Sequence, residues 1–124
     1  MADERDRFRD HRSPYFDLTA EMGVLGSLLL NPAVANDIKF EVSAEDFYDD
    51  AHRKLYAAMM GMFDSGRHMD VTILVSELKT AGDYERIGGA GYLAKLANSV
   101  PNAAQAKYYA QIVRSQANHR RLGR

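Results

Sequence analysis

The side chains of this sequence that are most able to take part in catalysis or metal binding are its acids and histidines. Six acids lie between residues 37 and 50, and the adjacent pair Asp49 and Asp50 could act as a general acid and base. A helix N-terminus also favours acids, because its dipole stabilises negative charge. None of the four histidines (His11, His52, His68 and His119) has the i, i+4 spacing that places two imidazoles on one metal. We therefore expect no metal site, and we interpret His52 as an ordinary helix residue beside the carboxylates.

Nucleotide chemistry and nucleophilic catalysis have weaker signals. The run Gly88-Gly89-Ala90-Gly91 is rich in glycine, but it lacks the Lys-Ser/Thr ending of a phosphate-binding loop and follows no predicted strand. The serines are explained as helix caps and loop residues, and no Ser/His/Asp arrangement follows from their spacing. The absence of cysteine excludes disulfides and thiolate metal sites. We expect no catalytic residue, no cofactor and no enzymatic activity in this chain.

A charge asymmetry is the remaining chemical signal. The net charge is −1, yet the region from residue 102 to 124 holds five bases and no acid. One hypothesis is a stand-alone helical DNA-binding or regulatory module that uses its arginines, although no aromatics are interleaved with them (Arg114, Arg120, Arg121 and Arg124). The acidic stretch and the basic end are either two solvated faces or complementary surfaces that meet other subunits or partners.

The length of 124 residues fits one domain. Residues 1–14 are dense in charge and predict a disordered tail with no signal-peptide pattern. The longest apolar run, Met22–Leu30, is far shorter than the roughly 20 residues of a membrane span. We therefore expect a cytoplasmic protein that does not enter a membrane.

Apolar spacing and capping residues predict helices throughout. Asp17, Asn31, Asp70 and Asn102 are plausible N-caps, and Ser43-Ala-Glu-Asp46 resembles a capping box. The opening helix is expected to bury a stripe of Leu18, Met22, Leu25 and Leu29, widened by Val24 and Leu28. The expected helices cover 17–30, 32–38, a turn at 43–48, 50–65, 71–81, 89–99 and a long one from 102.

A series of short blocks follows in order along these elements. They are Asp17-x-x-Ala20-Glu21-x-x-Val24-Leu25-Gly26, Glu45-Asp46-Phe47-Tyr48 with His52, Asp70-Val71-Thr72, Leu78, Ile87-Gly88-Gly89, Tyr92-Leu93, Leu96, Val100-Pro101, Tyr108-Tyr109-Ala110 and Ile112-Val113-Arg114. In order and spacing they resemble the N-terminal domain of the bacterial replicative DNA helicase, the DnaB family, over about residues 14–122.

The resemblance implies an all-α fold: a compact bundle of about six helices over residues 15–100, then the first long helix of a helical hairpin over 101–124. Such domains pair through the hairpin into a collar on a hexameric ATPase ring. The implied partners are other copies of the chain, the helicase-binding domain of primase and, as a further candidate, a helicase loader. ATP, Mg and most DNA contact would belong to a motor domain that follows, so the chain is expected to be a fragment.

The same resemblance gives the candidate interface. Tyr109, Ile112, Val113 and Gln116 would form the helix face that packs within the hairpin and across subunits, because an uncovered apolar stripe usually marks an interface. The adjacent charged residues are Arg114 and Arg120.

Overall fold

The computed structural model describes residues 15–122, and within that range every regular element is a helix. The expected all-α fold is confirmed, whereas the expected tail over 1–14 and Arg124 lie outside the described residues. The elements are α2 (Leu18–Leu30), the short 3-10 helix η1 (Pro32–Val34), α3 (Ala35–Ile38), the 3-10 helix η2 (Ala44–Asp46), α4 (Asp50–Asp64), α5 (Val71–Thr80), α6 (Gly89–Ala97) and α7 (Ala106–Leu122).

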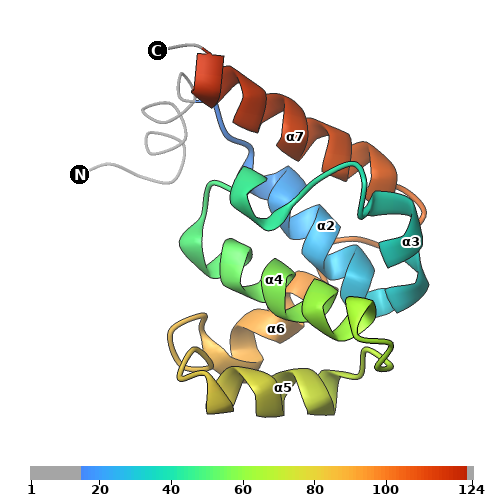
Figure 1. Ribbon diagram of the computed structural model, residues 1–124, viewed down its shortest axis with the longest axis vertical. Helices are drawn as coiled ribbons and strands as arrows, with labels where there is room; N and C mark the ends of the chain where they lie inside the picture. Colours follow the sequence, from blue (N-terminus) through green and yellow to red (C-terminus); the bar gives the residue numbers. More distant parts are fainter. Residues whose placement is uncertain (1–14, 123–124) are drawn as a thin grey trace.

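Helix α2 runs through the middle of the bundle, with α7 on one side, α4 and α6 against it, and α5 at the far end (Figure 1). It is buried almost all round, from Ala20 to Leu28. The expected single stripe was therefore too narrow: Leu18, Met22 and Leu29 are only half-buried, whereas Gly23 and Gly26 on other faces are buried. Small residues on those faces let neighbouring helices approach closely, and within α2 only Thr19 and Leu30 are exposed.

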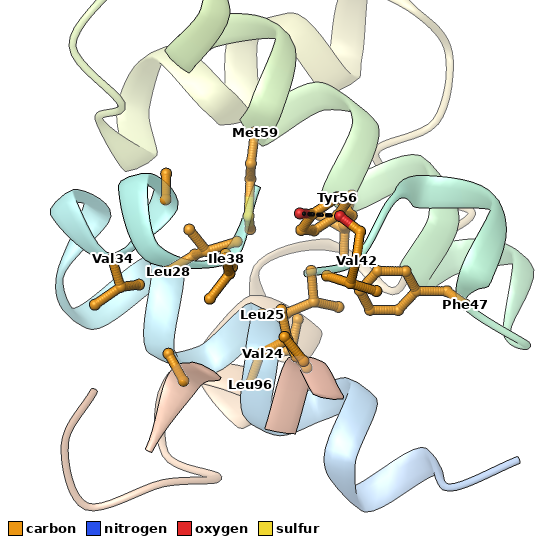
Figure 2. Packing of buried hydrophobic residues seen from close by; sticks show 14 of the residues in the cluster. Val24, Leu25, Leu28, Val34, Ile38, Val42, Phe47, Tyr56, Met59 and Leu96 are labelled. Atoms are coloured by element: carbon orange, nitrogen blue, oxygen red, sulfur yellow. Dashed lines mark hydrogen bonds between the residues drawn. The ribbon is translucent and has the colours of Figure 1, made fainter. Parts of the chain in front are cut away.

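The core is apolar and continuous (Figure 2). Leu25 from α2 and Leu55 from α4 are fully buried with Phe47, which follows η2. The one polar group drawn among these side chains is the Tyr56 hydroxyl, which donates to the Val42 carbonyl oxygen at 2.9 Å. Burial raises the pKa of Tyr56 above its ordinary value, so this hydroxyl remains a donor.

Three of the predicted capping signals are confirmed, those at Asp17, at Asp70 and at Ser43 with Asp46. Asp17 accepts a hydrogen bond from the Ala20 N–H, and Asp70 accepts from Thr72 and Ile73. The capping box of Ser43 and Asp46 is present in both directions. Gly66 and Gly82, which follow the C-terminal ends of α4 and α5, both have φ of +78°, the left-handed conformation that glycine adopts without strain.

The start of α7 differs from the expectation. Asn102 does accept a hydrogen bond, from the Ala104 N–H, but that bond closes a turn, and the helix begins at Ala106. Moreover, Ala106, Ala110 and Val113 belong to the same core as the preceding helices. Helix α7 therefore packs into the same core as the helices before residue 100. The predicted division of the chain into a bundle up to residue 100 and a hairpin helix after it remains a prediction.

Candidate interaction surface

Helix α7 is positioned by close contact with α2. Its inner face is made by Ala106, Ala110, Val113 and Ala117, which are all buried. The half-buried ring of Tyr109 lies over Gly23, so closely that a Cβ added at Gly23 would be 2.7 Å from ring atoms. The glycine in α2 thus creates the seat for a tyrosine in α7.

The predicted interface residues fall at different depths. Val113 is 2% exposed and belongs to the core, so the surface of this chain does not present it to a partner. Tyr109 and Ile112 are half-buried against the core, and Gln116 is half-buried. The other helices of the bundle therefore cover much of this apolar stripe, which the sequence analysis expected to be uncovered. A role of Tyr109, Ile112 and Gln116 across subunits remains a prediction.

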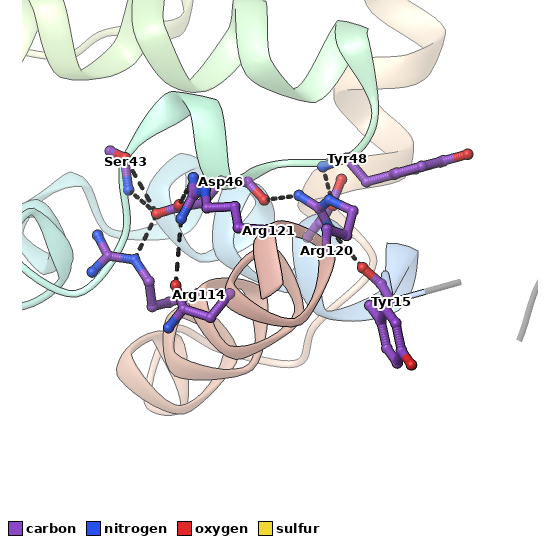
Figure 3. A network of polar contacts seen from close by, with 9 residues as sticks. Tyr15, Ser43, Asp46, Tyr48, Arg114, Arg120 and Arg121 are labelled. Atoms are coloured by element: carbon purple, nitrogen blue, oxygen red, sulfur yellow. Dashed lines mark hydrogen bonds and ion pairs between the residues drawn. The ribbon is translucent and has the colours of Figure 1, made fainter. Parts of the chain in front are cut away.

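The arginines of α7 converge on Asp46, whose side chain is 1% exposed (Figure 3). Arg114 Nε donates to Asp46 Oδ2 at 2.8 Å, and Arg121 donates to Oδ1 at 2.7 Å. Arg120 donates to two backbone carbonyl oxygens, those of Tyr15 and Asp46, each at 2.6 Å. Acidic and basic regions of the sequence thus meet within the molecule here, and α7 is tied to η2 along its C-terminal half.

Three of the four arginines proposed for DNA binding are engaged within the protein. Arg114, Arg120 and Arg121 each make hydrogen bonds within the protein, and Arg124 lies outside the described residues. A phosphate would have to compete with the Asp46 carboxylate for the first and third of these side chains. The arginines therefore have a structural use that needs no nucleic acid.

Burial by itself would raise the pKa of Asp46, but hydrogen bonds from the Ser43 backbone, Arg114 and Arg121 outweigh it and hold the pKa below its ordinary value. A carboxyl with a lowered pKa in the folded state stabilises the fold above its unfolded pKa of about 3.9 and loses this contribution as pH falls through its folded pKa. The contribution of Asp46 is therefore lost below about pH 4.

Asp46→Asn should lower the free energy of unfolding by about 2 kcal/mol at neutral pH, a typical value for charged hydrogen bonds. Urea unfolding of both proteins between neutral pH and acid should show this difference shrinking below about pH 4. Asp50→Asn is the matched control, because Asp50 is 68% exposed in its pairs with Arg53 and Lys54, and it should leave stability nearly unchanged. A difference that stays constant to acid pH would contradict the role given to the Asp46 charge.

A second polar network lies inside the bundle. Glu21 is 1% exposed, and it accepts hydrogen bonds from the Tyr48 N–H at 2.6 Å, the Asp49 N–H at 3.3 Å and His52 Nδ1 at 2.7 Å. His52 Nε2 lies 2.6 Å from the Tyr92 hydroxyl. Burial, with the carboxylates of Asp49 and Glu21, raises the pKa of Tyr92 to about 12, so its hydroxyl keeps its proton. The network joins α2, α4 and α6 through side chains whose polar atoms are paired.

Asp49 and Asp50, the two acids that could act as a general acid and base, both make contacts that hold the structure. Asp49 is the N-cap of α4 and accepts from the His52 N–H at 3.1 Å. Hydrogen bonds from Lys54 and Arg53 lower the pKa of Asp50, which makes it a weaker base than a general base at neutral pH requires. The geometry supports capping, as the helix dipole favours.

Comparison with known proteins decides the family. A family model described as the DnaB-like helicase N terminal domain matches residues 13–115.

The chain belongs to the DnaB-like helicase N-terminal domain family.

Individual relatives of this DnaB-type domain agree with the family match. The replicative DNA helicase DnaB of Geobacillus stearothermophilus is 40% identical over 90% of the chain and 24% of its own length. The homologue from Mycobacterium leprae is 41% identical over 90% of the chain and 18% of its own length. The chain therefore spans about a quarter or less of these relatives. A solved structure, the N-terminal domain of DnaB helicase from Mycobacterium tuberculosis, matches with a TM-score of 0.85 at 41% identity, covering 89% of this chain and 76% of that one.

The blocks that carried the DnaB resemblance meet in space. Glu21 of the first block binds Tyr48 and His52 of the second, and His52 binds Tyr92 of a later one. The last block also reaches the second, through Arg114 and Asp46. Residues 27 to 68 positions apart in the sequence thus form the polar contacts of one DnaB-type bundle. The sequence signal for these contacts is a polar residue on a helix face that is expected to be apolar: Glu21 lies one turn before Leu25.

Sequence reasoning missed the exposed apolar side chains. On α7 the exposed ones are Tyr108, at 59%, and Leu122, at 84%, rather than the predicted Tyr109 and Val113. Between α3 and η2, Phe40 is 82% exposed. No sequence period distinguishes these from core residues, because exposure depends on what packs above them.

Among the described residues, no helix is both long and apolar enough to cross a membrane.

Proposed function

We propose that this chain is the N-terminal collar domain of a hexameric replicative DNA helicase, which assembles subunits and docks primase and a helicase loader during DNA replication. The observation that carries the proposal is the match of nearly the whole chain to about a quarter of curated replicative helicases. In this proposal ATP, Mg and DNA unwinding belong to the rest of the parent protein, which acts in the cytoplasm.

The placement of α7 supports the assembly part of the proposal. The inner face of the helix is held by α2 and by the Asp46 contacts, so its direction is fixed by the bundle. Its outer face presents Tyr108 and Leu122 to solvent. A second helix packing on this outer face would complete a hairpin and cover both side chains.

A longer stretch of the parent protein, extended past residue 124, should self-associate more strongly than the 124-residue chain. The added residues would complete the hairpin and bring its apolar face to a second copy. Sedimentation velocity at matched concentrations measures the difference. Leu122→Glu in the longer protein should weaken association, whereas Ile73→Glu, at another exposed apolar site on α5, should leave it unchanged. Equal sedimentation of the short and long proteins would count against the collar.

A further inference from the structure

The segment that leads into α2 lies against the last turn of α7 (Figure 1). Tyr15 belongs to no helix, yet both its ring and its carbonyl group contact α7. The ring stacks on that of His119, with centroids 5.1 Å apart and an interplanar angle of 26°. The carbonyl oxygen accepts a hydrogen bond from Arg120 at 2.6 Å, across 105 positions of the sequence. The two ends of the described chain are therefore in direct contact.

Arg120 joins this contact to η2 and the residues after it. Its guanidinium also donates to the Asp46 carbonyl oxygen at 2.6 Å, and its Cζ lies 5.6 Å from the ring centre of Tyr48 (Figure 3). The Phe16 ring stacks on the same tyrosine, with centroids 4.1 Å apart and an interplanar angle of 10°. Three segments that are distant in the sequence thus meet around one arginine.

The apolar core does not reach these contacts. Ala117 is the last buried residue of α7, and none of residues 118–122 is buried. Tyr15 and Tyr48 are 41% and 43% exposed. A helix end without buried apolar contacts frays readily. The last turn of α7 is therefore held by ring contacts and hydrogen bonds close to the surface, to which Arg121 adds its pair with the Asp46 carboxylate.

We propose that these side chains form a clasp that opens and closes as one unit while the core stays folded; its members are Tyr15, Phe16, Tyr48, His119 and Arg120. When the clasp is closed, the segment that enters α2 and the turn that ends α7 keep one relative direction. When it is open, Tyr15 and Phe16 leave α7, and the last turn of that helix becomes mobile. Contacts of this kind are weak at exposed sites, so opening requires no unfolding of the bundle. The clasp goes beyond the proposed function and does not rest on helicase assembly.

NMR relaxation of the 124-residue chain tests the clasp, because order parameters report the mobility of each backbone amide. Arg120→Ala removes both hydrogen bonds and the cation. It should lower the order parameters of Tyr15 and Phe16 from about 0.85, the value for rigid backbone, toward the flexible range below about 0.6. Tyr15→Ala removes one half-exposed ring and should lower the order parameters of residues 118–122. Helix α4 should stay rigid in both variants.

Two control variants remove similar side chains outside the clasp. Tyr108→Ala removes a tyrosine that is 59% exposed near the start of α7. Arg67→Ala removes an arginine whose surface partner is Glu77. Both variants should leave the order parameters of residues 15–16 and 118–122 unchanged.

Three results would overturn the proposal. One is unchanged mobility of residues 118–122 in Tyr15→Ala. Another is an Arg120→Ala variant in which α7 frays while Tyr15 and Phe16 stay rigid, since the two ends would then move independently. The third is a loss of order that extends through α4, because the contacts would then support the whole fold rather than a separate unit. None of these results depends on self-association of the longer protein, so the clasp and the collar fail in different experiments.

Discussion

Glu21→Ala should lower the free energy of unfolding by about 3–5 kcal/mol, the cost of removing one partner from a buried charged network. The buried carboxylate accepts from three donors, on Tyr48, Asp49 and His52, and alanine leaves them without this acceptor. Because a domain is stable by only about 5–15 kcal/mol, this single change should make the fold marginal. Urea unfolding followed by circular dichroism measures the loss.

Two further variants separate the network from general effects of substitution. Glu21→Gln keeps the side-chain shape and one acceptor oxygen, so it should cost less than alanine, about 1–3 kcal/mol for a donor left unpaired. Glu77→Ala removes a glutamate that is 45% exposed and pairs with Arg67. It should change stability by about 0–1 kcal/mol, as for other surface pairs. If Glu21→Ala were no more harmful than Glu77→Ala, the network would not hold α2, α4 and α6 together.

Gly26→Ala should lower the free energy of unfolding by about 2–4 kcal/mol, in the upper range for an overpacked interior. An added Cβ would lie 2.3 Å from the Leu96 carbonyl oxygen and 2.8 Å from Ser99 Oγ. The first of these atoms belongs to the backbone of α6, so relief requires α2 and α6 to move apart. Thermal and urea unfolding should both report the loss.

Gly61→Ala is the matched control, because it makes the same change inside helix α4 with nothing within 4 Å of the added Cβ. Alanine has the higher helix propensity, so this variant should gain up to about 1 kcal/mol. The two substitutions should therefore act with opposite signs. A similar effect from both would mean that helix propensity, rather than the contact between α2 and α6, governs position 26.

The sequence by itself determined the elements of this protein. Caps such as Asp17 and Asp70, and terminators such as Gly66, act within one turn of the chain, so nearby residues are enough to predict them. The ordered blocks also identified the DnaB family, which the comparisons confirm. The prediction that Asn102 caps the last helix was wrong, because an Asx turn and a helix cap use the same kind of local hydrogen bond.

Only the tertiary structure decided which faces are covered. Whether Val113 is buried and Tyr108 exposed depends on α2, which ends at Leu30, far from both residues in the sequence. The same holds for the pairing of Asp46 with Arg114 and Arg121, 68 and 75 residues away. Helical periodicity reports that a residue is apolar and on a given side, but packing sets the partner of that side. For that reason Tyr108 and Leu122, rather than Val113, are the apolar side chains of α7 that lie in solvent.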